Sequence, residues 1–135
     1  GALGVWGDTN IGTFYGAIRT ICEKITSDTT ATFLVCTPLG RYNSTDQNRK
    51  TNSEGVPINE LGFTLRDYCD AIVKTCHFYG VPVLDLNYDL GWNKYNIHNF
   101  SNDGLHPSTA GNIPLAKLIC NEIKRYVWYK LNILE

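Results

Sequence analysis

The stretch of sequence that decides the fold is residues 59–86, NELGFTLRDYCDAIVKTCHFYGVPVLDL. Its first part places apolar side chains at helical spacing, and Gly80 follows at the position where a helix is commonly capped. Residues 81–86 (VPVLDL) then form a short apolar run, which is typical of a parallel strand buried on both faces. We therefore predict a helix over 59–79 and a strand over 81–86.

A similar helix and strand precede this stretch. Residues 14–27 have apolar side chains at helical spacing and follow Thr13, a favourable N-cap residue. The run at 31–37 (ATFLVCT) is short and apolar, and it ends before Pro38. We therefore predict a second helix over 14–27 and a second buried strand over 31–37.

A third helix is predicted at the carboxyl end, running to about Lys130. Because proline is tolerated only in the first turn of a helix, Pro114 indicates that Asn112 is the N-cap and that Ile113 opens the helix. Side chains on the apolar stripes of the three helices are expected to face the core; they include Ile21, Leu61, Ile123 and Val127.

The order helix, strand, helix, strand, helix predicts an α/β layered fold with a parallel sheet. Two strands offer too little sheet for three amphipathic helices. We therefore expect residues 1–135 to be a single partial domain, the carboxyl-terminal part of a larger α/β domain whose N-terminal strands are missing. An exposed sheet edge in such a piece favours self-association or pairing with the missing N-terminal part.

The composition excludes several classes of protein. The chain has 135 residues, of which 43% are hydrophobic, and its 12 basic and 13 acidic residues give a net charge of −1. This balance is typical of a folded globular domain and argues against a nucleic-acid binder, which needs a basic stripe. No apolar run is long enough to span a membrane. Nothing in the composition indicates a cellular compartment.

The five cysteines are expected to be small reduced core residues rather than ligands or disulfides. No Cys-x-x-Cys pair is present, so a zinc site is not indicated. Cys69 and Cys76 lie two helical turns apart, about 10 Å along the axis, which is too far for a disulfide. The remaining cysteines are Cys22, Cys36 and Cys120.

Two long polar segments, 39–57 and 87–105, follow the predicted strands, and ligands in open α/β sheets bind beyond the carboxyl ends of strands. The second segment leads into Asp103-Gly104-Leu105-His106-Pro107. An aspartate three residues before a histidine can fold back and accept the hydrogen on Nδ1, which leaves Nε2 free as a general base. The alternative is a surface turn in which Asp103 only caps backbone amides.

The DGLHP block at 103–107, followed by Ser-Thr-Ala-Gly and an apolar helix, resembles the last sequence block of the SGNH (GDSL-type) hydrolases. Three further segments resemble the same family: TFYGAIRTICEKI at 13–25, TFLVCTP at 32–38 and LRDYCDAIVKTCHFYGVPVLDLN at 65–87. The resemblance covers nearly the whole chain and implies a three-layer α/β/α, flavodoxin-like fold. It implies His106 as the catalytic base and Asp103 as its partner, with no cofactor and no metal.

The family's remaining groups are a serine nucleophile in a Gly-Asp-Ser block, a glycine and an asparagine, which together supply the oxyanion hole. None of the five serines follows a Gly-Asp pair. Gly7-Asp8-Thr9-Asn10 is a candidate substitute with Thr9 as nucleophile, or a form of the asparagine-bearing block. We prefer a third interpretation, in which residues 1–12 are a loop just downstream of that block.

The resemblance implies a serine esterase or acylhydrolase acting on a small-molecule or carbohydrate ester. This chain alone is expected to be inactive, because it lacks the nucleophile and the oxyanion donors. The alternative is a non-catalytic binding module that uses loop aromatics, namely Tyr42, Trp92, Tyr95 and Phe100. A metal site built from His98, His106, Asp103 and Asp89 is a further alternative, although its spacing matches no known motif.

Two loop residues are candidate substrate contacts. Arg41 follows the end of a predicted strand, and Trp92 lies in the loop before the DGLHP block. Each has a plainer alternative, since an exposed arginine is usually only solvated and a loop aromatic often anchors its loop to the core. His77, near the end of the helix over 59–79, is expected to be a surface residue that interacts with the helix dipole.

Overall fold

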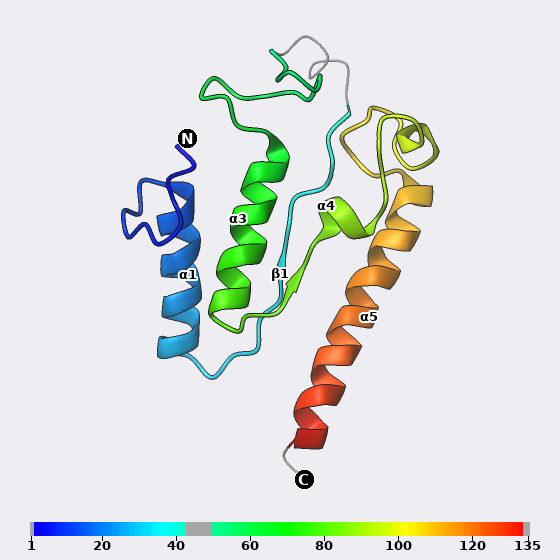
Figure 1. Ribbon diagram of the computed structural model, residues 1–135. Coiled ribbons are helices and arrows are strands. Elements are labelled where there is room, and N and C mark those ends of the chain that lie inside the picture. Colours follow the sequence, from blue (N-terminus) through cyan, green and yellow to red (C-terminus); the bar gives the residue numbers. More distant parts are fainter. Residues whose placement is uncertain (1, 43–49, 134–135) are drawn as a thin grey trace.

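The computed structural model describes residues 2–42 and 50–133, with side chains up to Trp128. It is an α/β structure (Figure 1). Its elements, in chain order, are α1 (Phe14–Asp28), β1 (Val35–Cys36), α3 (Leu65–Phe78), β2 (Val83–Leu84), α4 (Leu86–Asp89), the 3₁₀ helix η1 (Ile97–Asn99) and α5 (Thr109–Ile133). None of the described helices is both long and apolar enough to cross a bilayer.

The two predicted strands pair in parallel, as expected from the helical connection between them. Val35 lies opposite Val83 and Cys36 opposite Leu84. The regular pairing covers two residues of each strand, which is shorter than the predicted runs at 31–37 and 81–86. The prediction that both faces of the strand are buried was wrong for β1, because Val35 is only half-buried and Cys36 is exposed.

Helix α1 begins at its predicted cap. The hydroxyl of Thr13 accepts a hydrogen bond from the amide of Gly16 (3.2 Å) and donates to Asp8 Oδ2 (2.9 Å). Gly16 is required here, because a Cβ at this position would lie 2.0 Å from the carbonyl oxygen of Asn10. The segment before α1 is therefore folded against the first turn of the helix.

Helix α3 begins at Leu65, six residues later than predicted. The reason is a capping box: Thr64 Oγ1 accepts from the Asp67 amide at 3.2 Å, and Asp67 Oδ2 accepts from the Thr64 amide at 2.7 Å. Residues 59–63 form a turn instead, and Leu61 is exposed rather than in the core. The predicted end is confirmed, with Gly80 at φ +63° just beyond the helix.

The core lies between α1, α3 and the strand pair. Helices α1 and α3 pack side by side on one side of the strands, and α5 runs on the other side (Figure 1). The buried members of this cluster are Cys22, Ile72, Cys76 and Val81, and half-buried apolar residues surround them. Burial raises the pKa of the Cys76 thiol to about 12, so this thiol stays protonated at neutral pH.

The cysteine prediction was partly correct. All five are free thiols, and Cys22, Cys69 and Cys76 are buried core residues. Cys36 and Cys120 are exposed, because they lie on faces of β1 and α5 that no described element covers.

Helix α5 begins at Thr109, three residues before the predicted cap. The cap is Ser108, whose Oγ accepts from the Gly111 amide at 3.3 Å. Pro114 therefore lies inside the helix rather than in its first turn. The inward positions predicted for Ile123 and Val127 were wrong, as was that for Ile21 on α1, because about half of each side chain is exposed.

Hydrogen bonds among Thr37, Asp85 and Arg66, here called the polar lock, connect the carboxyl ends of the two strands. Thr37 follows β1, is buried, and donates through Oγ1 to Asp85 Oδ1 at 2.9 Å. Asp85 follows β2 and accepts two hydrogen bonds from Arg66 of α3, at 2.7 and 3.1 Å. Burial raises the pKa of Asp85, but the hydrogen bonds from Arg66 and Thr37 outweigh this effect and hold it below its ordinary value.

Thr75 carries a buried hydroxyl that has no hydrogen-bond partner among the described residues. We expect Thr75→Val to stabilise the natural protein by about 1 kcal/mol, because it removes an unsatisfied polar atom at nearly constant volume. Urea unfolding measures the change.

The matched control for this prediction is Thr20→Val on α1, where the hydroxyl donates to the Gly16 carbonyl at 2.9 Å. The control is expected to be neutral or destabilising. If Thr75→Val lowers the free energy of unfolding as much as the control does, the Thr75 hydroxyl has a hydrogen-bond partner in solution and the prediction is wrong.

Candidate active site

The Asp103–His106 segment is a tight turn organised around one carboxylate oxygen. Asp103 Oδ1 accepts hydrogen bonds from the amides of Leu105 and His106, each at 2.8 Å. It also accepts from the hydroxyl of buried Ser101 at 3.1 Å. This is the self-capping behaviour of aspartate in turns, so the alternative expected from sequence is also present.

The other carboxylate oxygen faces the imidazole. Asp103 Oδ2 lies 2.7 Å from His106 Nδ1, within charge-assisted hydrogen-bond distance. The predicted pairing of Asp103 with His106 is therefore present in the structure. It places the proton of neutral His106 on Nδ1 and leaves Nε2 without a hydrogen-bond partner in the described ranges.

Both side chains are open to solvent, with 77% of His106 and 52% of Asp103 exposed. The pKa of Asp103 nevertheless lies well below its ordinary value. The largest cause is the hydrogen bond from the His106 amide, followed by those from the His106 side chain and the Leu105 amide. Asp103 is therefore ionised at any pH at which the protein would work.

Gly104 allows the turn between the two site residues to close. Its φ is +72°, a conformation that favours glycine, and it is buried. Its carbonyl accepts a hydrogen bond from the Tyr42 amide at 2.7 Å. The turn is thereby joined to the segment that leaves β1.

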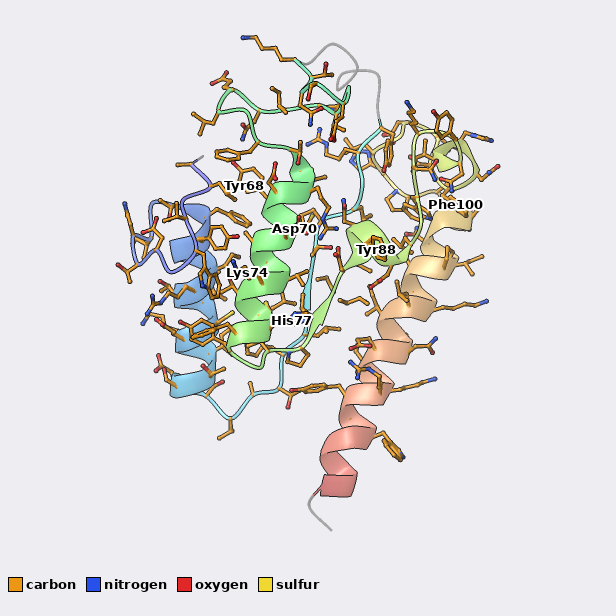
Figure 2. The ribbon with its side chains drawn as sticks, in the orientation of Figure 1. Tyr68, Asp70, Lys74, His77, Tyr88 and Phe100 are labelled. Atoms are coloured by element: carbon orange, nitrogen blue, oxygen red, sulfur yellow. The ribbon has the colours of Figure 1, made fainter. Side chains whose placement is uncertain are left out.

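The base of the turn is closed by the carbonyl of Phe100. It accepts from both the amide (2.8 Å) and the hydroxyl (3.0 Å) of Ser108. Gly111 packs directly against it, since a Cβ there would lie 2.2 Å from the Phe100 oxygen. Ser101 and Pro107 form an isolated antiparallel bridge beside it. The Asp103–His106 segment is therefore packed against the N-terminal end of α5, where Figure 2 shows Phe100.

The two candidate substrate contacts, Trp92 and Arg41, differ from each other in burial, and only Arg41 is exposed like the Asp103–His106 pair (the dyad). Trp92 is buried, 6% exposed, and its ring stacks on Phe100 with centroids 5.2 Å apart. The geometry supports the anchoring alternative for Trp92. Arg41 is exposed and directly precedes Tyr42, so a role in substrate binding stays a prediction.

The metal alternative has no structural support within residues 2–42 and 50–133, where no group of three or more potential ligands comes together. His98 lies exposed on η1. Asp89, at the end of α4, has a raised pKa, caused first by burial and then by the charge of Asp85. His77 is exposed near the carboxyl end of α3, as predicted (Figure 2).

None of Ser101, Ser108 and Thr9 is placed as a substitute for the nucleophile. The hydroxyls of Ser101 and Ser108 are engaged with Asp103 and Phe100. Thr9 is exposed in the loop before α1, and Figure 1 shows that loop and the Asp103–His106 turn on opposite sides of α3. Ser44 lies outside the described residues.

Three features of the site escaped the sequence interpretation. Ser101 binds Asp103, Tyr42 joins Gly104 to Trp92, and the network of Thr37, Asp85 and Arg66 locks the strand ends. The Ser101 contact is local, since Ser101 lies only two residues before Asp103. The other two depend on contacts between distant segments and leave no local signal.

No family model and no curated protein sequence matches the chain. Among the solved structures similar to it are two crystal structures. One is 29% identical with a TM-score of 0.72, over 92% of this chain and 57% of its own. The other, a structural-genomics target from Lactobacillus plantarum, is 28% identical with a TM-score of 0.70, over 93% of this chain and 58% of its own. The chain thus spans under three fifths of the length of either structure.

The depressed pKa of Asp103 predicts a pH dependence of stability. The unfolded carboxyl titrates near pH 3.9, so the stabilisation is complete above about pH 5 and is lost as pH falls toward the lower folded pKa. We expect Asp103→Asn to lower stability at pH 6 and to have progressively less effect toward pH 3. Urea unfolding across this range measures the difference.

The control for the pH series is Glu60→Gln, which removes one negative charge from an exposed residue outside the turn. A constant difference between the natural protein and Asp103→Asn from pH 6 to pH 3 would contradict the prediction.

Proposed function

We propose that the natural protein containing this chain is a serine ester hydrolase of the SGNH type, in which His106 is the general base and Asp103 its partner. The observation that carries the proposal is the 2.7 Å contact between Asp103 Oδ2 and His106 Nδ1, together with an Nε2 that has no hydrogen-bond partner within residues 2–42 and 50–133. The resemblance of the DGLHP block to that family supports the same assignment.

The proposal includes the fold of the whole protein. In it, β1 and β2 belong to a three-layer α/β/α, flavodoxin-like sheet, and strands outside residues 1–135 complete that sheet. Two observations support this arrangement. The chain pairs only two described strands against three long helices, and similar solved structures are considerably longer than the chain.

In the proposed reaction, a serine supplied from outside residues 1–135 attacks the carbonyl carbon of an ester. His106 Nε2 accepts the serine proton as the C–O bond forms. The tetrahedral intermediate collapses, the alcohol leaves with that proton, and an acyl-enzyme remains. Water then attacks the acyl-enzyme with His106 again as base, and the acid and the free serine are released.

Asp103 has two roles in this scheme. Its Oδ2 holds the proton of neutral His106 on Nδ1, so that Nε2 is the basic atom. Its negative charge then stabilises the imidazolium formed during each half-reaction. The hydrogen bonds from Leu105, His106 and Ser101 to Oδ1 keep Asp103 ionised and its carboxylate correctly oriented.

We expect His106→Ala in the natural protein to lower kcat for p-nitrophenyl acetate on the order of 10³-fold, because removal of one triad member disables the unit. Asp103→Asn should lower kcat by at least about 10²-fold by disturbing the tautomer. Both variants should retain their fold by circular dichroism.

The matched control is His98→Ala, which removes an exposed histidine from the same loop and should leave kcat unchanged. Full activity in His106→Ala would overturn the proposal. Absence of turnover in the natural protein, with binding of a carbohydrate ester retained in His106→Ala, would favour the binding-module alternative.

A further inference from the structure

Tyr42 connects two distant points of the loop that carries Asp103 and His106. Its amide donates to the Gly104 carbonyl at 2.7 Å. Its hydroxyl donates to the Trp92 carbonyl at 2.9 Å, across a sequence separation of 50 residues. One residue in the segment that leaves β1 therefore holds both the beginning of the loop and the turn at its end.

Both contact points matter for the geometry of the dyad. Gly104 lies between Asp103 and Leu105, so the hydrogen bond to its carbonyl fixes the turn relative to the segment that follows β1. Trp92 stacks on Phe100, whose carbonyl closes the base of the turn through Ser108. Movement of Gly104 or Trp92 would therefore displace the Asp103 carboxylate or the groups that donate hydrogen bonds to it.

The dyad itself receives little packing. His106 and Asp103 are largely exposed, so hydrogen bonds rather than buried contacts hold their side chains. By contrast, Gly104 and Trp92 are buried residues, and loss of the Tyr42 donors would remove hydrogen bonds that their carbonyl oxygens accept. Burial also raises the pKa of the Tyr42 phenol, so the hydroxyl remains a hydrogen-bond donor.

Gly40 makes room for this arrangement. A Cβ at position 40 would lie 2.8 Å from Cε2 and 3.1 Å from the hydroxyl oxygen of Tyr42. A larger residue there would push the phenol ring away from its position. The glycine thus allows the ring to reach the Trp92 carbonyl.

We infer that Tyr42 is a positioning residue for the Asp103–His106 pair: by clamping Gly104 and Trp92 to the end of β1, it keeps Asp103 in place to hold His106 in its Nδ1–H tautomer. The kinetic consequence rests on the proposed esterase function. The effect on the turn does not, because it follows from the hydrogen bonds alone.

The test uses Tyr42→Phe in the natural protein, which keeps the ring and removes only the hydroxyl. We expect amide hydrogen exchange at Leu105 and His106 to accelerate about 5- to 10-fold. The fraction of neutral His106 with its proton on Nε2, measured by ¹⁵N NMR, should rise. The control is Tyr95→Phe, an exposed phenol in the same loop, which should change neither quantity.

Exchange at Val35 and Thr37, whose amides pair β1 with β2, separates positioning from a general loss of stability. These amides should exchange as in the natural protein. Equal acceleration at all four sites would overturn the positioning role, and so would unchanged exchange and tautomer at His106.

Gly40→Ala provides a second variant that leaves Tyr42 intact and displaces its ring. It should reproduce the faster exchange at Leu105 and His106, and an unaffected turn would overturn the inference. With p-nitrophenyl acetate as probe, Tyr42→Phe should lower kcat about 5- to 10-fold with a smaller change in KM. If the natural protein shows no ester hydrolysis, the proposed function fails, while exchange and tautomer still decide the role of Tyr42.

Discussion

The structure depends on the parallel pairing of β1 with β2 and on the polar lock at their carboxyl ends. The pairing itself is short, two residues on each strand. Thr37, Asp85 and Arg66 extend it beyond the last paired residues and tie α3 to the same point. Because both strands end there, the segment with Tyr42 and the loop with His106 leave the sheet side by side, and an interaction between them becomes feasible.

The Asp103–His106 pair illustrates how an exposed site can still be well defined. The imidazole and the carboxylate are both largely open to water. Hydrogen bonds orient both side chains. The amides of Leu105 and His106 orient the Asp103 carboxylate, and that carboxylate orients the His106 imidazole. In the proposed hydrolase, segments outside residues 1–135 would supply the remaining walls of the site and exclude water.

Sequence patterns predicted the elements better than their boundaries. The three long helices, the two strands and their parallel arrangement follow from periodicity and chain order. The short helices α4 and η1 were not predicted, because they lie in the segment after β2 that was expected to be a polar loop. The starts of α3 and α5 were misplaced because Thr64 and Ser108 cap these helices, whereas the predicted starts were chosen from apolar spacing and from Pro114. Inward positions for Ile21, Ile123 and Val127 were wrong because periodicity shows which face is apolar, and only neighbouring elements decide whether that face is covered.

The sequence by itself determined the α/β character and the Asp103–His106 turn, because helix periodicity and the hydrogen bonds of that turn involve residues only a few positions apart. Only the tertiary structure decided the strand register, the lock formed by Arg66 and Asp85, the burial of Trp92 and the clamp at Tyr42. These contacts join segments far apart in the chain, so they depend on how helices and strands pack together, and no local spacing encodes them.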